Sequence, residues 1–363
     1  MQPARAEFTP VHLITGFLGS GKTTLLKRLL AEPRLSDTAV LINEFGEIGL
    51  DHQLLERIDE NMVLLQSGCL CCTIRGELVD AMRLLLSKRE QGLVPWFRRV
   101  VIESTGLADP FPILSTIHAD AVLRHHFQLA QVVTVVDAVH GESQFDLYEQ
   151  SVKQAAVADH LVLTKTGLAG LAATQALEDR VRRINPMASL RHAERDGLDA
   201  DSLLCTDRLD FSSKTTAARQ WFADARPAAA LPPLDALAAE PAQAGRYLGT
   251  RRGARSASHR HDADVRAFAI SMAEPLDWTT LGIWLTMLVH RHGARILRLK
   301  GILNVRGSPT PVAIHGVQHL IHPPVHMAAW PGDERHSRLV FIVKGLEPGV
   351  VERSLNAFVG AMA

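Results

Sequence analysis

Short apolar runs alternate with helical patterns from residue 11 to residue 204. Runs of Val, Leu and Ile are typical of buried strands, whereas apolar residues three or four positions apart indicate one face of a helix. Such alternation predicts an α/β fold with a mostly parallel sheet that helices cover on both faces. The expected strands are 11–15, 39–43, 62–65, 99–103, 132–136, 160–164 and one near 188–191, and the expected helices are 23–31, 74–91, 110–118, 148–158 and 172–184.

The pattern changes beyond residue 204. Ala, Pro, Arg and Ser dominate from about residue 215 to residue 264, as in a loosely structured linker. Strand and helix patterns then return and predict a smaller α+β domain. We therefore expect a first domain at 1–204, a linker at 205–264 and a C-terminal domain at 265–363. The expected C-terminal elements are strands 265–272, 295–306, 310–322 and 338–344, and helices 275–292 and 348–360.

Composition narrows the functional classes without identifying one. The chain has 363 residues, a formal net charge of zero and no basic block, so neither a nucleic acid nor an anionic membrane surface is an expected partner. No apolar run is long enough to span a bilayer. The start of the chain, MQPARAEFTP, lacks the apolar core of a signal peptide, so we expect a cytoplasmic protein.

Residues 16–23, GFLGSGKT, match the phosphate-binding P-loop pattern. Glycine-rich turns also connect strands and helices without binding a ligand, but here an apolar strand pattern precedes the complete motif and a helical pattern follows it. Lys22 is expected at the terminal phosphates and the Thr23 hydroxyl on Mg²⁺. The sequence thus predicts a P-loop NTPase whose phosphate-binding residues are Gly16, Phe17, Leu18, Gly19, Ser20, Gly21, Lys22, Thr23 and Thr24.

Three of the four cysteines, Cys69, Cys71 and Cys72, lie within four positions. Because cytosolic thiols stay reduced, this CxCC cluster is better interpreted as a metal site than as a disulfide. Three thiolates suit Zn²⁺, with Cu(I) or Co²⁺ as lesser options, and leave one position for water or a movable side chain. Packing of buried thiols and redox chemistry are the weaker alternatives, and the isolated Cys205 is expected to be inert.

Together these motifs resemble one family. The order and spacing of ITGFLGSGKTTLL, NEFGEIGLD, SGCLCC, VVIESTGLADP and VVTVVDA are similar to those of the CobW-like GTPases, P-loop proteins regarded as metallochaperones. The segments Arg298–Gly301 and Ile314–Gln318 resemble the second domain of that family. The resemblance covers most of the chain except roughly residues 205–262, and it implies a GTPase that delivers Zn²⁺ or Co²⁺ to a client protein.

The resemblance also implies roles for particular acids. Glu103 ends an apolar strand and takes the Walker B position, where it would act on Mg²⁺ through water; with Lys22 and Thr23 it forms the expected catalytic set. Residues 43–51 would sense the nucleotide. Within them Glu47 is the candidate fourth ligand of the CxCC metal, and Glu44 or Asp51 would orient the attacking water. A solvated acidic loop remains the alternative for each of these three.

One segment departs from the family pattern. GTPases of this type recognise guanine with [NT]KxD, whose Asp accepts hydrogen bonds from the base. This chain has Thr164-Lys165-Thr166-Gly167, so Lys165 can pack over a base but Gly167 supplies no carboxylate. The nearby Glu194 and Asp196 are both candidates to supply the missing carboxylate. Without one of them, GTP binding should be weaker and less selective over ATP, and Gly167→Asp should improve it.

Two other functions remain open from the sequence: a metal-responsive protein that binds nucleotide but barely hydrolyses it, and a P-loop kinase for a small molecule. A kinase would leave CxCC without a role, so it is the weaker of the two. The client protein, the metal and a nucleotide- or metal-dependent homodimer stay undecided. The His259–His261 segment is interpreted as solvated linker, and the C-terminal histidines are interpreted as structural or partner-facing.

Overall fold

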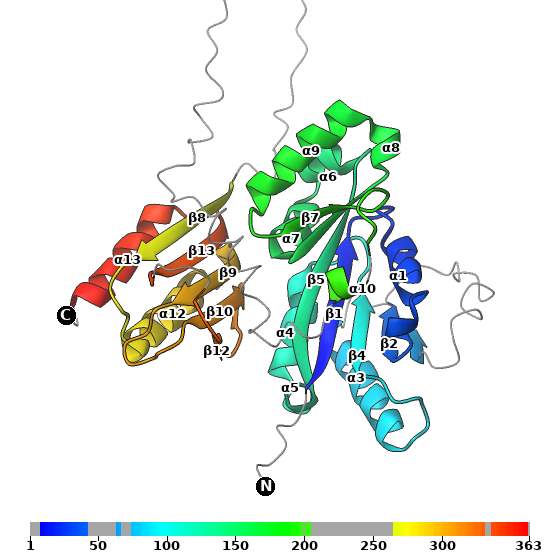
Figure 1. The fold of residues 1–363 in the computed structure, drawn as a ribbon, viewed down its shortest axis with the longest axis horizontal. Coiled ribbons are helices and arrows are strands. Elements are labelled where there is room, and N and C mark those ends of the chain that lie inside the picture. The colour runs from blue at the N-terminus through cyan, green and yellow to red at the C-terminus, as the bar shows by residue number, and fades with distance from the viewer. Residues whose placement is uncertain are drawn as a thin grey trace, which may run out of the picture.

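The computed structural model describes residues 8–42, 63–66, 74–198, 200–204, 264–330 and 335–361. Two sheets are present in these ranges, each with its own helices (Figure 1). The predicted metal ligands Cys69, Cys71, Cys72 and Glu47 lie outside the described residues, as does nearly all of the expected linker. The three-part division of the chain therefore stays a prediction.

The first sheet is parallel throughout and has seven strands in the order β3-β2-β4-β1-β5-β6-β7. The strand that leads into the predicted P-loop, β1, is therefore central. Because all strands run in one direction, their carboxyl ends all lie at the same edge of the sheet. The strands are β1 (Thr9–Gly16), β2 (Thr38–Ile42), β3 (Val63–Gln66), β4 (Arg99–Glu103), β5 (Phe127–Asp137), β6 (His160–Thr164) and β7 (Ser189–His192).

Helices cover both faces of this sheet. Successive side chains of β1 point to opposite faces: Leu13 packs in a cluster with residues of α3, α4 and α5, whereas Ile14 packs with α1 and α10. A third cluster joins β5 and β6 to α6, α7 and α9. These helices are α1 (Lys22–Leu30), α3 (Ile74–Glu90), α4 (Pro110–Ala119), α5 (Leu123–His126), α6 (Gly141–Leu147), α7 (Glu149–Val157), α8 (Thr166–Ala169), α9 (Leu171–Ile184) and α10 (Ala200–Leu204), with a 3₁₀ turn at Pro33–Leu35.

The second sheet is antiparallel, with the order β11-β10-β9-β13-β8 and β12 paired to β10. Its core contains Trp284 of α12, 1% exposed, whose ring lies edge-on to Phe341 of β13. The elements are β8 (Val265–Met272), α12 (Trp278–His292), a 3₁₀ turn (Gly293–Arg295), β9 (Ile296–Leu303), β10 (Val312–Val317), β11 (Leu320–Ile321), β12 (Val325–His326), β13 (Ser337–Lys344) and α13 (Pro348–Ala361).

The predicted fold class is confirmed: a parallel α/β sheet with a P-loop, plus an α+β C-terminal domain. Two C-terminal boundaries differ from the prediction for local reasons. The expected strand 310–322 is two strands, because Gln318 adopts a left-handed turn conformation (φ 50°) between them. The expected helix 275–292 begins at Trp278, because the Asp277 side chain caps it by accepting from the Thr280 N–H.

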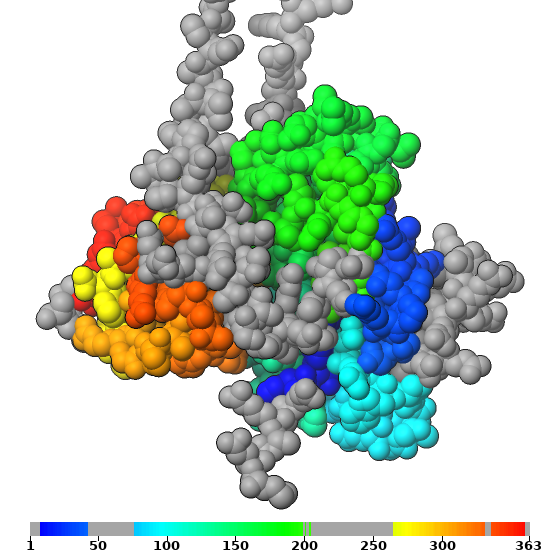
Figure 2. Space-filling view, in the orientation of Figure 1, coloured from blue at the N-terminus to red at the C-terminus, as the bar shows by residue number. Residues whose placement is uncertain are grey.

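The two domains pack against each other. Val265, Leu297 and Ile342 of the C-terminal domain belong to the same apolar cluster as residues of α7 and α9. In Figure 2 the C-terminal residues, yellow to red, lie beside the first domain. None of the helices among the described residues combines the length and apolar character needed to cross a membrane.

Candidate nucleotide site

The P-loop follows β1 and leads into helix α1 through residues with unusual backbone angles. Gly16, Gly19 and Gly21 have φ values of 143°, 71° and 95°, which L side chains rarely adopt. At Gly16 a side chain is also sterically excluded, since its Cβ would lie 2.2 Å from the Val135 carbonyl oxygen of β5. The glycines therefore let the loop approach β5 closely and then enter α1 directly at Lys22.

Two polar side chains of this loop, Lys22 and Ser20, are buried. Lys22 is only 8% exposed, and its ammonium donates to the Phe17 carbonyl oxygen at 3.1 Å. The Ser20 hydroxyl is fully buried and has no hydrogen-bond partner in the part of the chain that the structure describes. A phosphate group fits such a site, because its oxygens accept from a lysine, a hydroxyl and the amides at the start of a helix.

Thr23 and Glu103 form the second part of the site. The Thr23 hydroxyl donates to Glu103 Oε1 at 2.6 Å, and Glu103 is 5% exposed at the end of β4. Next to it, Ser104 binds the P-loop strand twice, through its N–H to the Ile14 carbonyl and its hydroxyl to Thr15. A hydroxyl beside a carboxylate is the oxygen donor set that Mg²⁺ prefers.

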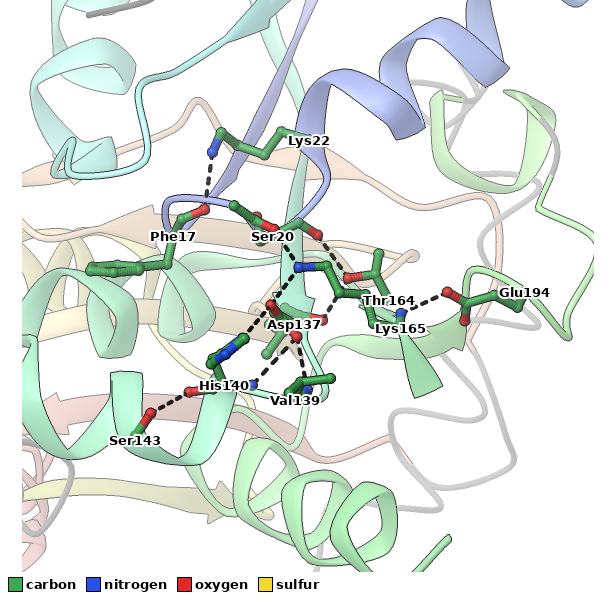
Figure 3. Close-up of polar contacts among 12 residues, drawn as sticks. Phe17, Ser20, Lys22, Asp137, Val139, His140, Ser143, Thr164, Lys165 and Glu194 are labelled. Atoms are coloured by element: carbon green, nitrogen blue, oxygen red, sulfur yellow. Dashed lines mark hydrogen bonds and ion pairs between the residues drawn. The ribbon is translucent and has the colours of Figure 1, made fainter. Parts of the chain in front are cut away.

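Lys165 connects three segments at the end of β6 (Figure 3). Its ammonium donates to the Gly19 carbonyl of the P-loop at 2.8 Å and to Asp137 Oδ2 at 2.7 Å. Burial raises the pKa of Asp137, but hydrogen bonds from Lys165, His140 and the Val139 N–H lower it below its usual value overall. Lys165 itself has φ 59°, a conformation unusual for a side-chain-bearing residue. These contacts fix the stem of Lys165 next to the P-loop, where a base stacked on it would lie.

Glu194 and Asp196, the two acids expected as substitutes for an aspartate at position 167, lie in different places. Glu194 accepts from the Lys165 N–H at 2.6 Å and from the Thr166 hydroxyl at 3.0 Å, so it contacts the expected base motif directly. Asp196 instead accepts from the His192 N–H at 2.7 Å, within its own turn after β7. A Cβ built on Gly167 meets nothing within 4 Å, so the position is open toward solvent.

The helix α7 buttresses the loop after β4. Gln154, fully buried, donates to the carbonyls of Gly106 and Ala108, and Lys153 pairs with Asp109 at 2.9 Å. The residue before the helix, Tyr148, packs on the Phe17 ring of the P-loop with 4.5 Å between ring centroids. These supporting residues were missed from the sequence. The sequence offers one signal for them: a glutamine, Gln154, among the apolar positions of a predicted helix.

The predicted nucleotide-binding residues thus lie along one edge of the first sheet. Lys22, Thr23, Glu103, Thr164 and Lys165 are joined to the P-loop or to each other by hydrogen bonds, with the Thr164 hydroxyl donating to the Ser20 carbonyl at 2.7 Å. Leu18 and Thr24 are exposed. No cluster of three His, Cys, Asp or Glu residues suited to a metal occurs within the described ranges, which exclude CxCC. The metal ligands stay a prediction.

Comparison with known proteins gives two family matches. Residues 10–191 match the model described as CobW/HypB/UreG, nucleotide-binding domain, and residues 265–359 match the cobalamin synthesis protein cobW C-terminal domain. The first match includes the P-loop, the segment 43–51, CxCC, Glu103 and Lys165.

Similar proteins cover nearly the whole chain. The zinc chaperone YjiA of Escherichia coli is 31% identical over 92% of this chain and 93% of its own length. The zinc chaperone CobW of Pseudomonas aeruginosa is 29% identical over 96% of this chain and 90% of its own length. The crystal structure of Zn(II)-bound YjiA GTPase matches with a TM-score of 0.67 and 26% identity, over 97% of this chain and 99% of that one.

Proposed function

The chain belongs to the CobW/HypB/UreG family, and we propose that it is a GTP-hydrolysing metallochaperone that delivers Zn²⁺ from its CxCC site to a client protein in the cytoplasm. Its similarity to proteins named zinc chaperones, over more than nine-tenths of the chain, makes zinc the preferred cargo. Co²⁺ is the second choice, because thiolates bind it as well.

One observation carries the proposal: the register of four neighbouring strands. Gln66 of β3 pairs with Ile42 of β2, Ile42 pairs with Glu103 of β4, and Glu103 pairs with Ile14 of β1. The CxCC segment follows Gln66 and the segment with Glu47 follows Ile42. Strands β3 and β2 both end at the edge of the sheet where Thr23 contacts Glu103. This position of the strand ends supports the proposal that nucleotide and cargo metal influence each other.

The residues of the site account for hydrolysis by positioning and by charge. Lys22 and the loop amides would hold the β- and γ-phosphates of GTP, while Lys165 would support the base. The Thr23 hydroxyl and, through water, Glu103 fit Mg²⁺, which when bound neutralises charge on the phosphates. Ser104 and Gln154 keep Glu103 and its loop fixed relative to the P-loop.

If GTP brings Glu47 onto the metal at CxCC, zinc affinity depends on the nucleotide. By linkage, zinc then raises the affinity for GTP by the same factor by which GTP raises the affinity for zinc. A coupling of about 1–3 kcal/mol is ordinary for such linked sites. During the cycle the protein would then bind zinc tightly in one nucleotide state and release it to the client protein in the other. A homodimer that depends on nucleotide or metal is compatible with this cycle and is not needed for it.

The test measures Zn²⁺ affinity by chelator competition in the nucleotide-free, GDP and GTP forms, together with Zn²⁺-stimulated phosphate release without any acceptor substrate. We expect different affinities in the three forms and faster release with zinc. Replacing Cys69, Cys71 and Cys72 by Ser should abolish both effects, and Cys205→Ser is the matched control that should abolish neither. Equal zinc affinity in all three forms would leave a metal site without a chaperone cycle. Nucleotide-dependent zinc binding without hydrolysis would instead indicate a metal-responsive binding protein.

A further inference from the structure

The loop after β7 brings a carboxylate to the base motif. Glu194 is exposed, yet both of its oxygens are positioned: Oε1 accepts from the Lys165 N–H at 2.6 Å and Oε2 accepts from the Thr166 hydroxyl at 3.0 Å. Figure 3 shows Glu194 bound to the backbone of Lys165, on the side away from Asp137. Lys165 is the residue whose stem would support the base, so the carboxylate is fixed relative to the base site.

In the [NT]KxD motif the last position supplies the carboxylate that recognises guanine, and in this chain that position is Gly167. A guanine presents two adjacent donors, N1–H and the 2-amino group, which match the two oxygens of one carboxylate. Each Glu194 oxygen has a second lone pair left after its contact with the 165–166 segment. Gly167, next to Thr166, carries no side chain that would separate Glu194 from a base.

The other nearby acids are engaged elsewhere. Asp196 turns back onto the His192 N–H. Asp137 is 1% exposed and accepts from the Lys165 ammonium and from the turn that contains Val139 and His140. Glu178 pairs with His192 at 3.1 Å. Among these acids, Glu194 alone is both exposed and bound to the base motif.

We propose that Glu194 is the specificity-determining residue that recognises the guanine edge, in place of the aspartate absent at position 167. This inference rests on the proposed function, because it assumes that the site binds GTP. It makes the protein selective for GTP over ATP: adenine presents an acceptor at N1, which a carboxylate repels. The 165–166 contacts would hold the carboxylate ready before nucleotide arrives, so little ordering is needed on binding.

A purely structural role for Glu194 makes a different prediction. If Glu194 only held the 165–166 segment in place, its loss would weaken all nucleotides together. If it recognises the base, Glu194→Gln changes the preference, because the amide now donates where the carboxylate accepted. Xanthine has a carbonyl oxygen where guanine has the 2-amino group, so XTP should gain from the same substitution that weakens GTP.

The experiment is a competition of GTP, ATP and XTP against a fluorescent GTP analogue, on the full chain. In Glu194→Gln we expect the preference for GTP over ATP to fall about 10- to 100-fold, and XTP to bind more tightly than to the parent. Asp196→Asn is the matched control, since its amide oxygen can still accept from His192, and it should keep the parent preference. Gly167→Asp, which the open space permits, should restore GTP preference in the Glu194→Gln background and add little to the parent.

Equal weakening of all three nucleotides, or an unchanged preference in Glu194→Gln, would overturn the inference. The proposed function fails in a separate way. A parent that binds none of the three nucleotides, or that binds them equally well after Lys22→Ala, would overturn the nucleotide site itself and this inference with it.

Discussion

Arg298 on β9 joins the two domains by donating to the Val157 carbonyl at the end of α7 and pairing with Asp159 just beyond it. Lys300, on the same strand, lies 3.0 Å from the same carboxylate. Burial raises the pKa of Asp159, but the charges of Arg298 and Lys300 hold it far below its usual value overall. Since α7 also supports the loop after β4, this contact connects the C-terminal domain to an element of the nucleotide site.

Removing Arg298 should therefore cost much of the stability of the first domain. Arg298→Met keeps most of the side-chain volume but leaves the largely buried Asp159 carboxylate with only its contacts to Lys300 and the Val132 N–H among the described residues. Breaking a buried pair costs about 3–5 kcal/mol. Urea-induced unfolding measures the loss. The control is Arg266→Met, which breaks the more exposed pair with Glu347 and should cost less than about 1 kcal/mol. Equal losses in the two variants would show that the Arg298 contact has no special role.

Lys22→Ala tests the P-loop. The substitution removes the buried ammonium beside the Phe17 carbonyl, and electrostatic stabilisation of this kind is worth about 3–4 kcal/mol in the transition state. Phosphate release should fall by roughly two orders of magnitude or more, with an unchanged fold by circular dichroism. Lys27→Ala, in the last turn of the same helix, is the control and should keep the parent rate. Turnover in Lys22→Ala within a factor of two of the parent would exclude the assigned role.

Glu103→Gln tests the predicted magnesium site. The amide oxygen can still accept from the Thr23 hydroxyl, so the local structure should persist, but the charge that favours Mg²⁺ is gone. An interaction with a charged group is worth about 1.5–3 kcal/mol, so the Mg²⁺ concentration for half-maximal hydrolysis should rise about tenfold or more. Titration of phosphate release with Mg²⁺ measures this. An unchanged magnesium requirement would mean that Glu103 only positions Thr23.

The sequence predicted the first sheet well because its central strands β1, β2, β4 and β6 are buried on both faces. Such strands are continuous apolar runs, and each predicted run between 11 and 191 corresponds to a strand in the structure. Short helices escaped prediction: α6 and α8 have too few turns to show an apolar period. The break at Gln318 escaped for a similar reason, since one residue with a positive φ leaves no mark in an apolar pattern.

The same distinction holds for the site: residues in local sequence motifs could be predicted, whereas residues that act through contacts distant in the sequence could not. The P-loop is a local motif, and Glu103 could be placed because it ends an apolar run and lies in a segment that resembles the family. The structure shows that its strand pairs with β1. The choice between Glu194 and Asp196 could not be made, because it depends on which way a turn after β7 directs each side chain relative to Lys165. Gln154 likewise acts on a loop far away in the sequence. Contacts of this kind follow from packing, not from any pattern along the chain.

His12 gives the fold a predictable acid sensitivity. It lies on β1, is fully buried, and neither ring nitrogen has a hydrogen-bond partner within the described residues. Burial, aided by the charges of Arg99 and His160, lowers the pKa of His12 to about 3. An unfolded histidine has a pKa of about 6.5, so between these values the unfolded chain binds a proton that the native protein excludes.

The contribution of neutral His12 to the free energy of unfolding is therefore fully present above a pH of about 6.5. It is lost as the pH falls toward the pKa of His12 in the folded protein, by up to about 1.4 kcal/mol per pH unit. His12→Leu removes the titrating group, so the free energy of unfolding should fall less between pH 7.5 and pH 5 than in the parent. Urea denaturation at the two pH values measures the difference, and His125→Leu, at an exposed histidine, is the control that should behave like the parent. If His12→Leu loses as much stability on acidification as the parent does, the buried imidazole is not the cause of the acid sensitivity.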